Sequence, residues 1–222
     1  LLEGDLEAIV APGLVGIQLP KSSAPEHVRR ADELLTRLES ERGLEPGGIE
    51  ILVSLESARG VFHAHDILGA SPRVGSVMPG TAEHGDLMRD VGFVYTPDET
   101  ALLYARSHVL LAARALGIDN PIDGVYSDVR NEDGFVECCK IARMIGYRGK
   151  KVIHPSQIEP ANRIFAPSPE ELDFYQRVVE ALDEAAARGS AAVVVDGSMV
   201  DTATAFTARR MIEWAEALER NR

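Results

Sequence analysis

Residues 49–56 have the sequence Ile-Glu-Ile-Leu-Val-Ser-Leu-Glu, whose length and β-branched content predict a buried β-strand. Successive side chains of a strand point to opposite faces, so we expect one face to pack against helices. The apolar face carries Ile49, Ile51, Val53 and Leu55, and the other carries Glu50, Leu52, Ser54 and Glu56. Ligands bind at the carboxyl ends of parallel strands, which makes Glu56 the first functional candidate. The alternative is a solvated carboxylate at a strand end.

The rest of the chain repeats this strand in alternation with helices. Strands are expected over residues 15–20, 49–56, 74–78, 121–126 and 149–153. A spacing of about 30 residues is that of a βαβ step, and such alternation predicts a parallel α/β sheet. A long helix is expected from Pro97 to about Leu116.

Five βα units leave two interpretations of the fold, an open sheet or part of a closed barrel. A complete (β/α)8 TIM barrel takes about 250 residues and eight strands. Since five strands alone would expose unpaired edges, we expect residues 1–166 to be the last five βα units of such a barrel. Residues 167–222 are expected to form a C-terminal helical extension that packs on a neighbouring subunit, with a capping box from Ser168 to Glu171.

Composition narrows the class of protein. The chain has 222 residues, 45% hydrophobic and 26% charged, as in globular proteins. Its net charge of −12 argues against nucleic acid as the main partner. The two cysteines, Cys138 and Cys139, are adjacent and are expected to be free thiols in a reducing compartment, the cytoplasm. No apolar run approaches the ~20 residues that span a membrane, so no membrane association is expected.

A second acidic residue, Asp86, follows the next strand after that of Glu56. Carboxylates at adjacent strand ends can share one hard cation, and Mg²⁺ suits such a site because it takes one or two carboxylates and keeps several waters. Glu83 and Asp90 compete for the role of second ligand. Asp86 could instead be an acid that stabilises a helix N-terminus.

Other chemistries lack their motifs. No Gly-x-Gly-x-x-Gly, phosphate-binding loop or Gly-x-Ser-x-Gly elbow is present, which disfavours nicotinamide, nucleotide-triphosphate and elbow-type hydrolase chemistry. The six histidines have no spacing typical of a transition-metal site. Lys21 follows a strand, where a Schiff-base amine is conceivable, but a solvated lysine is the simpler interpretation.

Several short motifs occur in a recognisable order. They are Leu19-Pro20-Lys21, Leu55-Glu56-Ser57-Ala58-x-Gly60, Gly80…Asp86, Pro121-Ile122-Asp123-Gly124-Val125-Tyr126, Gly149-Lys150-Lys151-Val152-Ile153-His154-Pro155-Ser156-Gln157-Ile158 and Gly197-Ser198-Met199-Val200-Asp201. This set resembles the citrate lyase β-subunit-like branch of the HpcH/HpaI aldolase superfamily. The resemblance extends from about Asp5 to Ala215, and residues 149–158 are its most specific part.

The resemblance implies a (β/α)8 barrel, Mg²⁺ and acyl-CoA substrates such as malyl-, citramalyl- or citryl-CoA. It places Glu56 and Asp86 on the two metal ligands. Asp201 falls on an acid that reaches a neighbouring subunit's site, which implies a homo-oligomer, a trimer or hexamer. The turn at His154 and Pro155, with Gln157, falls where the barrel mouth meets CoA, and these three residues are the candidates for substrate binding.

Two features depart from the family pattern. The loop from Gly80 to Asp86 is longer than the family's Gly-x-x-Asp, which keeps Glu83 open as the second metal ligand. The family's first three strands, with the arginines that bind substrate oxygens, have no counterpart here. We therefore expect an N-terminal part to be absent from this sequence, which begins at Leu1 in mid-pattern.

The resulting expectation is an Mg²⁺-dependent carbon–carbon lyase of aldol or Claisen type acting on a hydroxyacyl-CoA thioester. Three alternatives stay open. The same site could work as an acyl-CoA thioesterase, or the chain could be a non-catalytic or partner-dependent subunit of a lyase complex. A class II pyruvate aldolase is disfavoured because no histidine stands out as its base.

Overall fold

The computed structural model describes residues 1–96 and 98–220 and divides the chain into two compact units, Leu1–Asn162 and Arg163–Arg222. The first unit holds the five expected strand–helix repeats, and the second holds two long helices and a hairpin. No helix in the described part of the chain is both long and apolar enough to cross a membrane.

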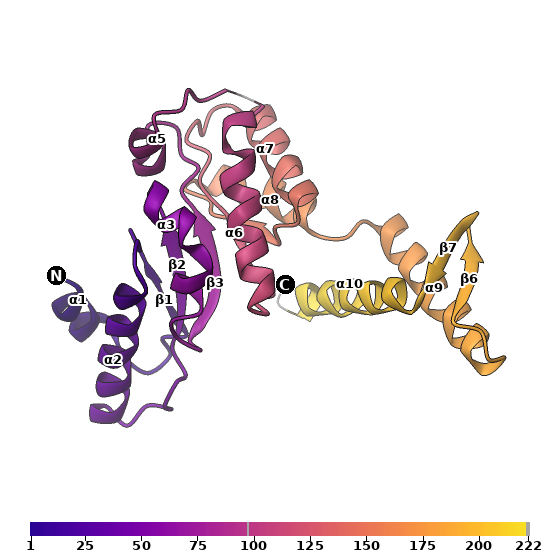
Figure 1. The fold of residues 1–222 in the computed structure, drawn as a ribbon, viewed down its shortest axis with the longest axis horizontal. Helices are drawn as coiled ribbons and strands as arrows, with labels where there is room; N and C mark the ends of the chain where they lie inside the picture. Colours follow the sequence, from indigo (N-terminus) through magenta and orange to yellow (C-terminus); the bar gives the residue numbers. More distant parts are fainter. Residues whose placement is uncertain (97, 221–222) are drawn as a thin grey trace. The chain divides into compact units, whose positions relative to one another are not determined.

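The first unit is built on a parallel sheet in the order β1-β2-β3 (Figure 1). Its strands are β1 (Gly16–Leu19), β2 (Glu50–Leu55) and β3 (Val74–Pro79). Leu19 pairs with Val53, and Leu55 pairs with Pro79, so the three carboxyl ends lie at one edge of the sheet. The predicted α/β class, the strand at residues 49–56 and its parallel pairing are confirmed.

The two faces of β2 differ as its sequence predicts. Ile51, Val53 and Leu55 are fully buried in the core that the sheet shares with its helices. Truncating one such side chain to alanine typically costs about 2–5 kcal/mol. On the opposite face Glu50 is exposed and Glu56, just beyond the strand, is half-buried. The apolar face therefore anchors the strand that ends at Glu56.

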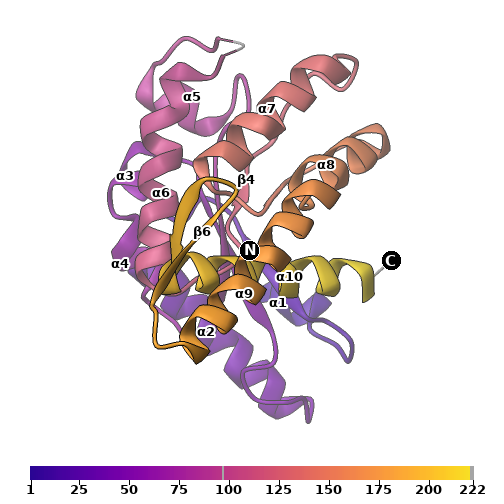
Figure 2. The ribbon, with the colours of Figure 1, turned by 90° about the vertical axis from the view of Figure 1, so that its right-hand side faces the viewer.

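Helices α2, α4 and α6 form the layer that covers this sheet, and α7 lies next to α6 in both Figure 1 and Figure 2. Proline opens α2, where its missing N–H costs nothing. The helices up to the unit boundary are α1 (Leu2–Ile9), α2 (Pro25–Glu41), α3 (Ala58–Phe62), α4 (Ala64–Leu68), α5 (Asp86–Val91), α6 (Leu103–Ala115), α7 (Glu132–Ile145) and α8 (Ile158–Phe165). Short 3-10 turns precede α6 (η1, Thr100–Leu102) and α8 (η2, Pro155–Gln157).

Strands β4 (Ile122–Asp123) and β5 (Gly149–Lys150) continue the parallel arrangement but are much shorter than predicted. β4 lies beside β3, where the Thr81 hydroxyl donates to the Val125 carbonyl at 3.1 Å. The backbone approaches so closely that a Cβ at Gly124 would lie 2.4 Å from the Pro79 carbonyl oxygen. This crowding explains why glycine follows β4.

A buried ion network ties β4 and β5 to α6. Asp123 accepts from Arg106 at 2.7 Å and from Lys150 at 2.5 Å, and Arg106 also pairs with Glu99 at 2.5 Å. Both cysteines are free, as predicted, and the Cys138 thiol donates to Glu99 at 2.9 Å. Burial raises the pKa of Cys138 to about 12, so the thiol is protonated at neutral pH.

The predicted helix from Pro97 begins later than expected. Pro97 itself lies outside the described residues, η1 begins at Thr100, and α6 begins at Leu103. Glu99, immediately before η1, has a left-handed backbone (φ 52°), and its carboxylate joins the buried network. A tertiary ion pair therefore interrupts a segment that local pattern assigned to one helix.

The second unit contains α9 (Pro169–Ala187), the antiparallel hairpin β6 (Ala192–Val195) and β7 (Ser198–Asp201), and α10 (Thr202–Arg220). The capping box predicted at Ser168 and Glu171 is present. β7 was not predicted. Its signal is Asp196-Gly197, which takes left-handed backbone at both positions (φ 50° and 78°), as a two-residue hairpin turn requires.

Candidate metal and substrate site

Three charged side chains meet at the carboxyl edge of the sheet. Lys21 follows β1, Glu56 follows β2, and Asp86 begins α5 after the loop that follows β3. All three line one polar cavity of about 350 Å³, together with Ser23, Ser57, Arg89 and Asp90. The parallel register is the cause, because it brings the ends of β1, β2 and β3 side by side.

Glu56 is positioned by close backbone packing. The Gly80 N–H donates to the Leu55 carbonyl at 2.8 Å, which continues the ladder between β2 and β3 to their ends. A Cβ at Gly80 would lie 3.3 Å from both Cα and Cγ of Glu56. Glycine at this position therefore leaves room for the Glu56 side chain at the rim of the cavity.

Asp86 lies in the first turn of α5, where the helix dipole favours an acid. Its carboxylate forms an ion pair with Lys21 at 2.7 Å, and Arg89, one turn along the helix, pairs with its other oxygen. The ammonium of Lys21 is the main cause of the lowered pKa of Asp86. Asp86 is therefore ionised at neutral pH, as a metal ligand must be.

Lys21, which the sequence suggested was merely solvated, is part of this charge cluster. It has a left-handed backbone (φ 53°), a conformation that non-glycine residues seldom adopt. Next to it, Ser22 is fully buried and donates its N–H to the Ser54 carbonyl at 3.1 Å. Gly60 packs against Ser22 so tightly that a Cβ there would lie 2.6 Å from the Ser22 carbonyl oxygen.

The two acids that competed with Asp86 occupy different places. Glu83 is exposed and does not line the polar cavity. Asp90 lines it, but its carboxylate accepts the Ala58 N–H at 2.7 Å and so caps the start of α3. Of these three acids, Asp86 is thus the one that lines the cavity with its carboxylate paired to exposed cations.

The fit of this site to Mg²⁺ follows from its donors. In the described part of the chain, no group of three or more His, Cys, Asp or Glu side chains is arranged as a metal cluster. Glu56 and Asp86 both line the polar cavity, which also has space for other oxygens. Mg²⁺ is commonly bound in this way, since it retains waters or takes substrate oxygens in its remaining positions.

The residues predicted to meet substrate after β5 divide into two kinds. His154 and Pro155 are exposed, and the His154 ring caps η2 by accepting the Ser156 N–H at 3.2 Å. Gln157 is 3% exposed, accepts from the Ile153 N–H at 2.9 Å and donates to the Tyr126 carbonyl at 3.1 Å. Its contacts are those of a residue that holds the loop, and substrate contact by the three stays a prediction.

Asp201 lies in the second unit, at the junction of β7 and α10. It is exposed, and its carboxylate accepts from the N–H and the hydroxyl of Thr204, both at 3.0 Å. The Thr204 N–H is the main cause of its lowered pKa. The predicted catalytic acid is thus an ionised, accessible carboxylate, and its role in a neighbouring subunit stays a prediction.

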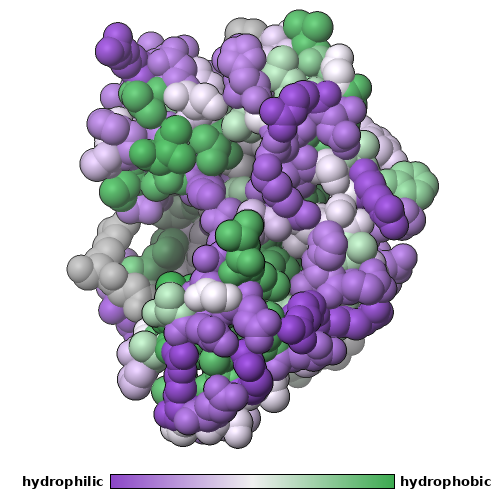
Figure 3. Space-filling view, turned by 90° about the vertical axis from the view of Figure 1, so that its left-hand side faces the viewer, coloured by the Kyte–Doolittle hydropathy of each residue, from purple (hydrophilic) through white to green (hydrophobic). Residues whose placement is uncertain are grey.

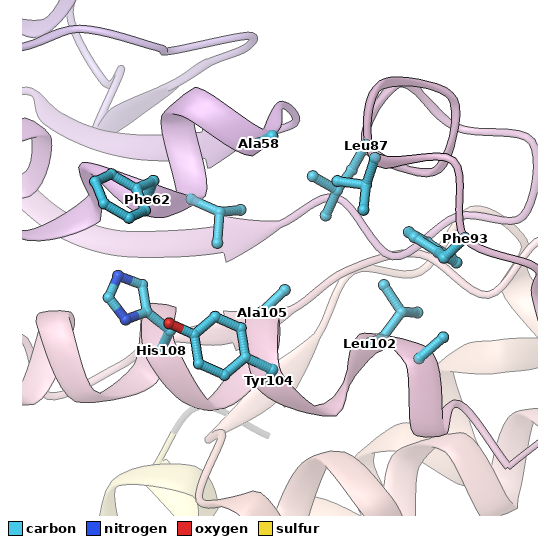
Figure 4. A pocket seen from close by; sticks show the side chains of 11 residues that line it. Ala58, Phe62, Leu87, Phe93, Leu102, Tyr104, Ala105 and His108 are labelled. Atoms are coloured by element: carbon cyan, nitrogen blue, oxygen red, sulfur yellow. The ribbon is translucent and has the colours of Figure 1, made fainter.

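A second pocket, of about 230 Å³, is lined mainly by apolar side chains (Figure 4). Phe62 and Leu87 lie on one side of it, opposite Tyr104 and His108 of α6. Leu87 lines this pocket while its neighbour Asp86 lines the polar cavity, so α5 contributes a wall to both. Figure 3 shows hydrophobic patches set among hydrophilic side chains on one face of the molecule.

Comparison with known proteins identifies the family. The family profile described as HpcH/HpaI aldolase/citrate lyase matches residues 1–155. The citrate lyase subunit beta of Escherichia coli K12 is 36% identical over 212 residues, which are 96% of this chain and 69% of the relative. The chain belongs to the HpcH/HpaI aldolase/citrate lyase family. A (3S)-malyl-CoA thioesterase of Cereibacter sphaeroides KD131 is 37% identical over 214 residues, 96% of this chain and 70% of the relative.

Solved structures agree with this membership. Protein CitE from Mycobacterium tuberculosis, in complex with magnesium, acetoacetate and coenzyme A, is 29% identical, with a TM-score of 0.69 over 96% of this chain and 73% of that one. A citrate lyase from Burkholderia xenovorans has a TM-score of 0.79 over 98% of this chain and 67% of that one. At 21% identity, the second likeness shows the fold alone.

Proposed function

We propose that Glu56 and Asp86 bind Mg²⁺ and that this protein cleaves a carbon–carbon bond in a hydroxyacyl-CoA thioester. The observation that carries the proposal is that the two carboxylates, from adjacent strand ends, line one polar cavity. The similarity to citrate lyase subunit beta supports the reaction class. The magnesium and coenzyme A in the CitE complex support the cofactor and the substrate class.

The architecture fits part of a (β/α)8 barrel, which we propose for the first unit. Five strands follow one another with helices between them, and each described strand pair of this unit is parallel. In such barrels the loops after the strands carry the active site. Lys21, Glu56 and Asp86 all occupy loops or helix starts of that kind.

In the proposed reaction, the metal ligands and Asp201 have different roles. Bound Mg²⁺ would polarise a substrate oxygen and stabilise the negative charge that develops as the bond breaks. Glu56 and Asp86 would hold that ion, and Ser23 and Ser57 offer hydroxyl groups in the same cavity. Asp201, contributed by a second copy in a homo-oligomer, moves a proton as a general acid–base. The products are an acyl-CoA and a 2-oxo acid.

A thioesterase activity is the second candidate, and the 37% identity to a (3S)-malyl-CoA thioesterase favours it. In that reaction water attacks the acyl carbon and releases the free thiol of CoA together with a hydroxyacid. The two reactions differ in their products, since only the lyase forms a 2-oxo acid. Measuring free thiol and 2-oxo acid separately with malyl-, citramalyl- and citryl-CoA therefore distinguishes them.

The test of the site uses Glu56→Ala and Asp86→Ala, assayed separately with and without Mg²⁺. We expect each to lower kcat/KM at least about a hundredfold, since each loses part of the charge stabilisation that the metal supplies. Glu83→Ala is the matched control, because Glu83 is a nearby exposed acid outside the cavity. Magnesium-dependent turnover that survives both substitutions, or that is lost in Glu83→Ala instead, would contradict the assignment.

A further inference from the structure

The Lys21 ammonium forms an ion pair with Asp86, the carboxylate that the proposed function assigns to a metal. Its Nζ lies 2.7 Å from Oδ2 of Asp86, and the charge of Glu56 acts on it as well. The structure therefore balances the two acids with a cation from the protein itself. A divalent ion that binds Asp86 must compete with this lysine and, once bound, repels it.

The backbone around Lys21 is held by close contacts, whereas its side chain is exposed. The left-handed backbone of Lys21 is held by its neighbour Ser22, which is buried under Gly60 and bonded to Ser54. The Lys21 side chain itself is 69% exposed. Its four-carbon stem can therefore redirect the ammonium within the cavity while the backbone stays in place.

We propose that Lys21 binds the carboxylate of the substrate's hydroxyacid segment, and that Asp86 holds Lys21 at the site until Mg²⁺ takes that aspartate. This inference rests on the proposed function, because it needs both the metal and a carboxylate-bearing substrate. If Asp86 binds the metal, the Lys21 ammonium loses its ion-pair partner. It then lies unpaired in the cavity that the substrate would enter. An ammonium with three N–H donors then suits a carboxylate.

Arg89 is the other cation at the cavity, and it is 74% exposed. It differs from Lys21 in its attachment, because it projects from α5 one turn after Asp86 on the same helix. Lys21 instead comes from a separate strand end, across the cavity from that helix start. An experiment must therefore separate the two cations.

The experiment measures two affinities by calorimetry with the complete protein: that of Mg²⁺ for the protein, and that of oxalate, a chelating dicarboxylate, for the Mg²⁺-saturated protein. For Lys21→Met we expect Mg²⁺ to bind roughly two- to fivefold more tightly, since a competing exposed ion pair is lost. We expect oxalate to bind at least about tenfold more weakly, since a charge-assisted hydrogen bond is lost. Lys21→Arg, which keeps the charge, should retain most of the oxalate affinity.

Lys140→Met is the matched control, because Lys140 forms an exposed ion pair of 2.6 Å with Glu137 outside the cavity. It should change neither affinity. Oxalate binding that is unaffected in Lys21→Met, or lost in Arg89→Met instead, would overturn this inference and leave the proposed function intact. A wild-type chain that binds no Mg²⁺ would overturn the proposed function, and this inference with it.

Discussion

The two edges of the β1–β2–β3 sheet both carry close ion pairs, but they use them differently. At the amino edge, Arg73 pairs with Glu39 at 2.6 Å, and their side chains are 6% and 0% exposed. At the carboxyl edge, Lys21 pairs with Asp86 at 2.7 Å, and their side chains are 69% and 27% exposed. Distance alone therefore does not distinguish a structural pair from one that can serve a ligand.

The charged groups at the two edges also differ in their hydrogen-bond partners. The Glu39 carboxylate accepts the Gly47 N–H at 2.9 Å and the Ile49 N–H at 3.1 Å, and Arg73 also donates to Asp32 at 2.6 Å. These charges at the amino edge thus hold loops and strands together. At the carboxyl edge Glu56 and Asp86 line a polar cavity, and Asp86 is paired with exposed cations in place of buried ones.

The largest effect on stability is expected at the amino edge. Arg73→Met leaves the fully buried Glu39 without its cation, and breaking one partner of a buried pair typically costs about 3–5 kcal/mol in free energy of unfolding. Urea unfolding followed by circular dichroism measures this. Lys21→Met is the control, and since its pair is exposed it should leave the urea midpoint near that of the wild type. Equal midpoints in the two variants would remove the contrast between the edges.

A second test of the contrast is how the stability contributed by Glu39 depends on pH. Its hydrogen bond with Arg73 is the main cause of its lowered pKa. A carboxyl group with a depressed pKa stabilises the fold above its unfolded pKa of about 4.3, and this contribution is lost as pH falls through the folded value. Glu39→Gln should therefore be about 1–3 kcal/mol less stable at pH 7, because the buried guanidinium loses one of its two anionic partners.

The same linkage predicts that the free energies of unfolding of the wild type and Glu39→Gln converge at acidic pH. As pH falls below about 4, the wild type loses the Glu39 contribution and the variant has none to lose. The difference in free energy of unfolding should shrink between pH 5 and the lowest pH at which both remain folded. A difference that stays constant over this range would show that the Glu39 charge does not stabilise the amino edge.

The sequence predicted those features that arise from local pattern. Alternation over residues 49–56 gave the strand, its buried face and the position of Glu56, and Ser168 with Glu171 gave a helix start. The short motifs indicated the family, which the comparisons confirm. In the proposed site, the resemblance placed Asp86 on the second ligand but left Glu83 open, and the cavity, which Asp86 lines and Glu83 does not, favours Asp86.

Features that depend on distant residues were missed. Arg106 and Lys150 both pair with Asp123 from separate elements, and no local sequence pattern predicts such a network. Lys21 was taken as solvated because its partner lies 65 positions along the chain. Strand β7 is a different kind of miss, since the Asp196-Gly197 pair that follows the β-branched run of β6 is a strong local signal for a hairpin.

The smallest effect on stability is expected for Asp86→Asn, and it sharpens the contrast most. The substitution removes the charge that Lys21 and Arg89 face, but both cations are exposed and can return to water without a buried penalty. We therefore expect a urea midpoint within experimental error of the wild type, together with Mg²⁺ binding at least about tenfold weaker by calorimetry, because a neutral amide is a poorer ligand than a carboxylate. Glu83→Gln serves as the control that should alter neither. Loss of stability in Asp86→Asn comparable to that of Arg73→Met would mean that the carboxyl edge, too, uses its charges to hold the fold.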